Sequence, residues 1–310
     1  MVHVSDIDFF VEHDEDIYAI DPISSDDPVV EKIGYNIAQL IEDGSCLQMG
    51  QGGVPNAILK FLGDKKDLGV HTEVFTDNLI PLIKAGVVNG KRKNINKGKI
   101  VATFVQGTKE LYRYVDHNNL IELKPVDYTN DVHVISQLDK FISINNIVDL
   151  DLFGQVNAES AGIKHISGTG GQLDFVMGAY LSKGGKSFIC LSSAMKGKDG
   201  TLKSKIRPTL ALGTAPTCTR SQGQYIVTEN GIATADDTRR VAFIRQALDG
   251  VQHCIADGIP VKGYFHWSLM DNFEWQKGYA MNFGLIAVNR ETMERTPKPS
   301  LAVLGGYANA

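Results

Sequence analysis

The stretch from Leu47 to Asp77, LQMGQGGVPNAILKFLGDKKDLGVHTEVFTD, constrains the fold more than any other part of the sequence. Leu47 to Met49 predicts a short strand, and the glycines that follow predict a flexible turn. Pro55 and the apolar spacing behind it predict a helix. A second apolar run, Leu68 to Phe75, predicts another strand. A strand, a helix and a strand in succession indicate a βαβ unit with parallel strands.

Glu73 lies near the carboxyl end of the second predicted strand. Ligands of open α/β sheets bind outside the carboxyl ends of the strands, so Glu73 and the glycine turn can face one crevice. Glycines let backbone N–H groups approach an anionic or carbonyl ligand closely. A carboxylate beside such donors offers a nucleophile and an oxyanion hole for covalent acyl transfer. The turn residues in this hypothesis are Gly50, Gln51, Gly52, Gly53 and Val54. The same residues also fit an ordinary turn between a strand and a helix, followed by a glutamate that is simply exposed to solvent.

The remaining pattern also alternates strands with helices. Asp27 and Pro28 predict the start of a helix that Gly44 ends, and Asp77 is a candidate cap for a short helix containing Pro81. The other predicted elements are a strand over Lys99–Val105, a helix over Lys109–Val115, one or two strands over Phe141–Val156, a helix from Leu173 and a buried strand over Ser187–Ser192. We therefore expect an α/β fold with a mainly parallel sheet flanked by helices.

Composition excludes several classes of protein. Apolar residues make up 43% and charged residues 22% of the 310 residues, as in globular proteins, and the net charge of −5 disfavours nucleic acid as a partner. The amino terminus lacks the pattern of a signal peptide, and no apolar run is long enough to span a membrane. The cysteines show no metal-ligand spacing, so we expect no metal site and a reducing, cytoplasmic compartment; they are Cys46, Cys190, Cys218 and Cys254.

Several segments resemble, in order, the carboxyl-terminal half of the acetyl-CoA hydrolase/CoA-transferase family. This group includes the 4-hydroxybutyrate and butyryl-CoA:acetate CoA-transferases, and the resemblance covers about residues 7–231. The segments are LIEDGSCLQMGQGGVPNAIL, DLGVHTEVFTDN, KPVDYTNDVHVI, DLFGQVNAES, ISGTGGQLDFVMGAYLSKGGKS and PTCTR. In that family, residues such as 1–26 join two halves of the enzyme, so the resemblance implies that the chain begins inside this linker.

The resemblance implies that Glu73 is the nucleophile and forms a glutamyl-CoA thioester. The implied substrates are acyl-CoA and a short-chain carboxylate, with no permanently bound cofactor. The loop of Gly168, Gly170 and Gly171, which by itself reads as an ordinary loop before a helix, would line the coenzyme A site. Glu159 is a rival nucleophile that ranks lower, because the matching family position is the HTE of Glu73. The basic run Lys91–Lys99 predicts a solvated loop; a contact with the phosphates of coenzyme A is the alternative.

The character of the sequence changes at a seam from Val227 to Ala233. Beyond it, the TENG motif and WSLMDNFEW resemble the last quarter of a family 1 β-glycosidase, over about residues 225–310. Those enzymes are (β/α)8 barrels, and the resemblance implies a nucleophile at Glu229 and sugar contacts at Trp267, Glu274 and Trp275. Retaining hydrolysis needs a second carboxylic acid. The family takes it from an Asn-Glu-Pro motif, and this sequence contains none.

We therefore expect a linker-like segment at 1–26, a CoA-transferase-like α/β domain at 27–223 and a glycosidase-like β/α segment at 224–310, as in a chimera. The leading hypothesis is a CoA-transferase, or an inactive form of one because the amino-terminal half is missing. A β-glucosidase using Glu229 and a non-catalytic chimera are the alternatives. A homo-oligomer is compatible with the sequence, which does not fix the oligomeric state.

Overall fold

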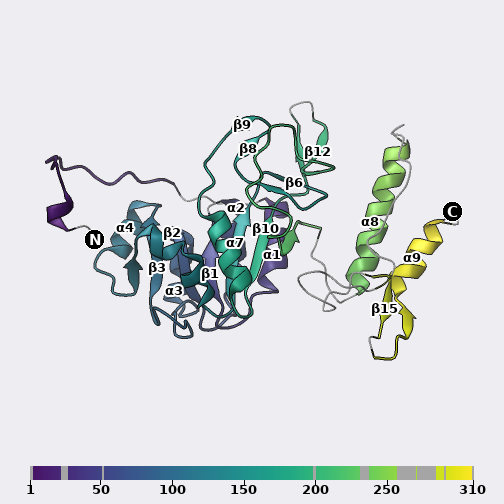
Figure 1. Ribbon diagram of the computed structural model, residues 1–310, viewed down its shortest axis with the longest axis horizontal. Helices are drawn as coiled ribbons and strands as arrows, with labels where there is room; N and C mark the ends of the chain where they lie inside the picture. The colour runs from purple at the N-terminus through teal and green to yellow at the C-terminus, as the bar shows by residue number, and fades with distance from the viewer. Residues whose placement is uncertain are drawn as a thin grey trace. The chain divides into compact units, whose positions relative to one another are not determined.

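A computed structural model describes residues 3–21, 27–50, 52–197, 200–230, 237–256, 270, 284–289 and 291–308 (Figure 1). The chain divides into two compact units, residues 1–225 and residues 226–310. The first unit contains most of a seven-stranded sheet, whose outermost strand contains the boundary with the second unit.

The strand order of this sheet is β14-β10-β5-β1-β2-β3-β4, and the five pairings from β10 to β4 are all parallel. This confirms the predicted α/β class. The strands are β1 (Cys46–Met49), β2 (Gly69–Phe75), β3 (Ile100–Val105), β4 (Ile121–Leu123), β5 (Phe141–Asn146), β10 (Lys186–Cys190) and β14 (Tyr225–Val227). Their continuous apolar character fits strands that are covered on both faces.

Short helices connect these strands. The helices of this unit are η1 (Val4–Asp6), α1 (Pro28–Ala38), α2 (Gly53–Leu59), η2 (Asp77–Leu79), α3 (Ile80–Lys84), α4 (Lys109–Val115), α5 (Val126–Thr129), α6 (Val132–Ser136) and α7 (Gln172–Leu181). α5 contacts β2 and β3, whereas α7 contacts β5 and β10 and lies in front of the sheet in Figure 1. α6 packs between them, against both α5 and α7.

Local sequence signals explain some helix ends and miss others. The Asp27 carboxylate accepts a hydrogen bond from Val29 N, and Pro28 opens α1 as predicted. The helix ends at Ala38, before Gly44, which instead occupies a later turn at φ 77°. The prediction that Asp77 caps a helix is wrong, because its carboxylate accepts hydrogen bonds from the backbone N and hydroxyl of Thr108.

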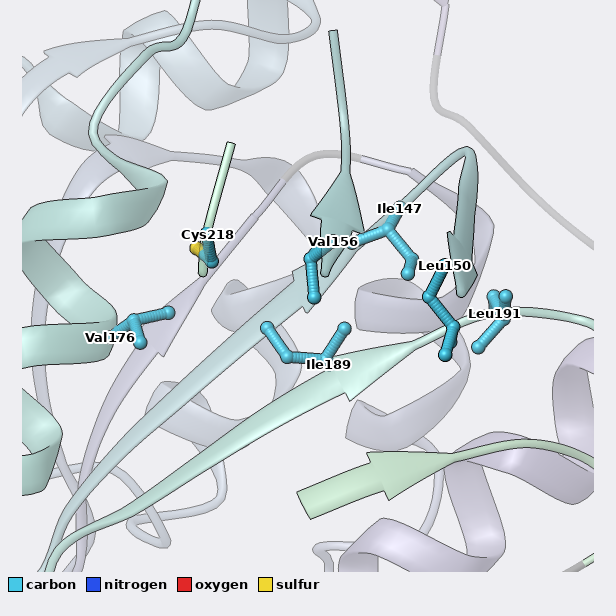
Figure 2. Packing of buried hydrophobic residues seen from close by; sticks show 7 residues of the cluster. All are labelled: Ile147, Leu150, Val156, Val176, Ile189, Leu191 and Cys218. Atoms are coloured by element: carbon cyan, nitrogen blue, oxygen red, sulfur yellow. The ribbon is translucent and has the colours of Figure 1, made fainter. Parts of the chain in front are cut away.

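A group of short strands lies beyond the carboxyl ends of β5 and β10 (Figure 1). They are β6 (Asp149–Asp151), β7 (Val156–Asn157), β8 (Ser160–Ala161), β9 (Lys164–His165), β11 (Ala194–Lys196), β12 (Leu202–Ser204) and β13 (Ile206–Arg207). Figure 2 shows the apolar cluster that joins them to β10 and α7: Ile147, Leu150, Val156, Val176, Ile189, Leu191 and Cys218. The predicted run Phe141–Val156 is therefore β5, β6 and the start of β7.

The basic run Lys91–Lys99 lies at the amino edge of the sheet, and the prediction of a solvated loop is wrong for Lys93. Lys93 is 4% exposed, and its Nζ donates to the carbonyls of Val70 at 3.0 Å and Lys99 at 2.9 Å. The aliphatic part of Lys93 packs over Gly69, the first residue of β2. The alternative of a contact with coenzyme A phosphates is not supported, because this edge is opposite the carboxyl ends where ligands of such sheets bind.

The second unit contains α8 (Asp237–Ala256), the antiparallel pair β15 (Ile286–Val288) and β16 (Arg295–Pro297), and α9 (Pro299–Ala308). Ile244, Leu248 and Leu285 form its buried cluster. In the described parts of the whole chain, no helix is both long enough and apolar enough to cross a bilayer.

Candidate active site at the carboxyl edge of the sheet

Glu73 and the glycine turn lie at the same edge of the sheet. β1 and β2 are neighbouring parallel strands with Cys46 opposite Gly69 and Leu47 opposite Val70. The turn follows the end of β1, and Glu73 lies near the end of β2, with its side chain half-buried. Both segments are therefore at the carboxyl edge, where the sequence predicts a ligand crevice.

The second glycine cluster meets Glu73 through Gly171. A Cβ atom on Gly171 would lie 2.9 Å from Glu73 Oε2 and 2.4 Å from Nδ2 of Asn130. Neither distance is compatible with a real side chain, so the absence of a side chain at Gly171 is what lets three segments converge. Those segments are the end of β2, the residue after α5 and the start of α7.

Gly171 is also the N-cap of α7, and no side chain caps this helix end. The first N–H groups of a helix have no partner within the helix, and the helix dipole makes this end attractive to a carboxylate. Glu73 Oε2 lies next to it. Asp174, in the first turn of α7, senses the same charge: burial raises the pKa of the Asp174 carboxyl, and the negative charge of Glu73 raises it further.

The other residues of the predicted loops are arranged unevenly. Gly168 and Gly170 are exposed, and Gly170 has φ 54°. In the first turn, Gly52 has φ 129° and is the N-cap of α2, Gly53 is half-buried and Val54 is buried. The N–H of Gly50 donates to the carbonyl of Ile144, so it extends the sheet instead of facing a ligand. Gln51 lies outside the described residues.

Glu159, the rival carboxylate, is buried in a network of its own. Its Oε1 accepts a hydrogen bond from the Thr217 hydroxyl at 3.0 Å, and its backbone carbonyl accepts from the N–H groups of Ile166 and Ser167. These bonds anchor the segment that leads to the second glycine cluster. Glu159 therefore makes hydrogen bonds within this loop through both its carboxylate and its backbone carbonyl.

Two residues near Glu73 were missed by the sequence interpretation. Asn130 belongs to the KPVDYTNDVHVI segment, but its spacing gave no sign of contact with Glu73 or Gly171. His71 precedes Glu73 on the same face of β2, is fully buried, and its Nε2 contacts the Thr129 carbonyl at 2.8 Å. The alternating side-chain pattern of a strand is the one signal that could have paired His71 with Glu73.

The glycosidase residues are only partly described. Glu229 follows the end of β14 and is half-buried, and Asn230 Nδ2 contacts its Oε1 at 3.5 Å. Trp267, Glu274 and Trp275 lie outside the described residues.

The first unit combines a parallel α/β sheet with a carboxylate and glycine loops at its carboxyl edge, an arrangement typical of ligand-binding α/β domains. Residues 107–246 match the acetyl-CoA hydrolase/transferase C-terminal domain. This match agrees with the family resemblance that the sequence shows. Residues 219–305 match glycosyl hydrolase family 1, and the predicted seam at Val227 to Ala233 lies where the two matches overlap.

Individual relatives agree with this division. The chain is 49% identical over 233 residues to 4-hydroxybutyrate coenzyme A transferase of Clostridium kluyveri, which is 75% of this chain and 53% of the relative. RipA from Yersinia pestis has a similar structure, with a TM-score of 0.69 and 37% identity, over 83% of this chain and 59% of that chain. The chain thus spans about half the length of the curated transferases that it matches. Over 72 residues, 23% of this chain and 14% of the relative, it is 50% identical to β-galactosidase of Pyrococcus woesei.

Proposed function

We propose that the first unit supports CoA transfer between an acyl-CoA and a carboxylate, with Glu73 as the nucleophile. The observation that carries this proposal is the convergence of Glu73 Oε2, Asn130 Nδ2 and the uncapped start of α7 around Gly171. A half-buried carboxylate beside preorganised donors has the parts of a covalent acyl-transfer site. The similarity to 4-hydroxybutyrate coenzyme A transferase suggests a short-chain carboxylate as the CoA acceptor.

The proposed reaction proceeds through two kinds of glutamyl intermediate. A Glu73 oxygen attacks the thioester carbonyl, the C–S bond breaks, and CoA thiolate leaves a mixed anhydride. The thiolate then attacks the glutamyl carbonyl, which releases the first carboxylate and forms a glutamyl-CoA thioester. An acceptor carboxylate reverses these steps, so that a new acyl-CoA leaves and Glu73 is regenerated.

The backbone of the first glycine turn is the proposed source of oxyanion stabilisation. Gly52 has a conformation that favours glycine, and α2 begins directly after it. The Gly50 N–H is bonded within the sheet, so among the described residues of the turn the candidate donors are the N–H groups that open α2. The exposed loop of Gly168 and Gly170 is the proposed wall for the coenzyme.

Trapping the intermediate tests the proposal. The purified chain is incubated with acetyl-CoA, and its peptides are analysed by mass spectrometry with and without hydroxylamine, which cleaves thioesters. We expect a hydroxylamine-sensitive CoA adduct on Glu73 that Glu73→Gln abolishes. Glu159→Gln is the matched control, because it changes the rival carboxylate and leaves Glu73 intact. An adduct on Glu159, or on no glutamate, contradicts the proposal.

The match of residues 219–305 to glycosyl hydrolase family 1 supports a competing activity at Glu229. A retaining glycosidase needs an acid partner for its nucleophile, and the sequence lacks the Asn-Glu-Pro motif that would supply it. We therefore expect no release of nitrophenol from an aryl β-glucoside. Release that Glu229→Gln abolishes would instead support the glycosidase alternative.

A further inference from the structure

We propose that His71 is a positioning residue for the Glu73 site, because both walls of the site rest on its buried imidazole. One wall is the α5–α6 junction with Asn130, and the other is the start of α7 with Gly171. The proposal deepens the proposed function, on which its catalytic readout depends. Its structural readout does not depend on that function.

The polar connection runs from His71 to Asn130. The imidazole Nε2–H donates to the carbonyl of Thr129 at 2.8 Å, which fixes the backbone just before Asn130. The Thr129 hydroxyl donates in turn to Asn130 Oδ1 at 3.1 Å. Since the amide oxygen is engaged there, the Nδ2 group is the end that faces Gly171 and Glu73.

The apolar connection runs from His71 to Gly171. The His71 ring meets the Phe141 ring edge-on at a centroid distance of 6.3 Å, and Phe141 stacks on Phe175 at 6.3 Å. Phe175 belongs to the first turn of α7, and its ring lies 3.1 Å from the point where a Cβ of Gly171 would be. The imidazole therefore reaches the start of α7 only through Phe141 and Phe175, whereas its hydrogen bond acts directly on the residue before Asn130.

The chemistry of the imidazole shows that its donor is what the site uses. Burial lowers the pKa of His71 to about 4, so the ring is neutral at pH 7. Its bond to a carbonyl assigns the proton to Nε2, and Nδ1 has no partner among the described residues. A buried acceptor without a partner is costly, and an apolar side chain would avoid that cost. We infer that the Nε2–H bond to Thr129 is the reason for a histidine here.

A matched pair of substitutions isolates this hydrogen bond. The side chain of His71→Gln keeps an N–H near the position of Nε2. His71→Met introduces a side chain of nearly the same length and shape as glutamine, but without a donor. Amide hydrogen exchange over residues 126–136 reports on the junction, since Thr129 N and Asn130 N are bonded within α5. We expect exchange there to rise about tenfold in His71→Met and to remain near wild type in His71→Gln. Exchange across Lys186–Cys190 of β10 serves as the reference.

The catalytic readout is the rate of CoA adduct formation at Glu73. A misplaced Asn130 and Gly171 should lower the maximal rate on the order of a hundredfold in His71→Met, with the half-saturating acetyl-CoA concentration unchanged and the rate restored in His71→Gln. Equal exchange in the two variants overturns the proposal. If the wild-type chain forms no adduct, the proposed function fails, while the exchange comparison still decides the role of His71. If His71→Met does not fold, His71→Asn replaces it, because its shorter amide does not reach Thr129.

Discussion

A glycine lies at each end of β2, Gly69 within the strand and Gly171 beside Glu73, and different kinds of group fill the space at the two glycines. At the amino end, the space over Gly69 is filled by the stem of Lys93, and the lysine amine is bonded to two carbonyls. At the carboxyl end, the space at Gly171 is enclosed by a carboxylate and an amide that belong to segments far apart in the sequence. The amino end is closed by polar groups that satisfy one another, whereas the carboxyl end brings a carboxylate to an uncapped helix start.

The contrast between the two ends of β2 shows where a functional site can lie in such a sheet. A buried charge is tolerated when its hydrogen bonds are made within the protein. Lys93 meets that condition at the edge of the sheet opposite the glycine loops. Glu73 is only half-buried and lies near a second carboxyl group, that of Asp174. Burial raises the pKa of Asp174, and the charge of Glu73 raises it further. Groups whose ionisation is opposed by their surroundings are typical of reactive sites.

The largest effect is expected from filling the carboxyl-end space. Gly171→Ala would put a methyl group against Asn130 Nδ2 and Glu73 Oε2, so at least one of them must move. We expect the rate of CoA adduct formation to fall about a hundredfold or more. Gly63→Ala is the control, because it lies outside the site, nothing lies within 4 Å of its Cβ position and its φ is not positive. Similar rates in the two variants would break the proposed contrast.

The next largest effect concerns His71, which lies between the two ends. The ordinary pKa of histidine is about 6.5, and burial lowers that of His71 to about 4. Between these values the unfolded chain binds more protons than the native protein, so the free energy of unfolding decreases as the pH falls. The stability that depends on a neutral His71 is fully present above pH 6.5. It is lost as the pH falls to 4, and the loss is on the order of 3 kcal/mol. Urea titrations from pH 7 to pH 4 should show a shallower dependence in His71→Gln.

A smaller effect is expected at the closed amino end. Lys93→Met keeps the stem over Gly69 but removes the donor to the carbonyls of Val70 and Lys99. We expect the free energy of unfolding to drop by about 2 kcal/mol because buried carbonyls lose their partner. CoA adduct formation per folded molecule should not change. Lys91→Met, at an exposed position of the same loop, should leave both quantities near wild type.

The smallest effect is expected from Glu42, which bridges Lys140 and Lys186 near the amino ends of β5 and β10. Hydrogen bonds to these lysines lower the pKa of Glu42 to about 2, but its side chain is 53% exposed. After screening by solvent, Glu42→Gln should cost about 0.5 kcal/mol of unfolding free energy. The difference should shrink in high salt. A loss that persists there would show that the amino end depends on this bridge more than its exposure implies.

The sequence was sufficient for elements whose signals are local. The βαβ pattern around Leu47–Phe75, the Asp27 cap and the helix over Lys109–Val115 follow from nearest-neighbour chemistry, and the structure confirms them. Asp77 and Lys93 were misinterpreted for the same reason. Their partners, Thr108 and the carbonyl of Val70, come from other elements, and no local pattern predicts them.

By itself, the sequence determined the α/β class, the two family resemblances and the choice of Glu73 as the candidate nucleophile, because these depend on residue types in order along the chain. Only the tertiary structure decided what surrounds Glu73. Asn130, Gly171 and His71 meet there because parallel strands bring distant connections to one edge, and because a missing Cβ leaves room for them. Contacts of that kind arise from packing in three dimensions, which the spacing of residues does not encode.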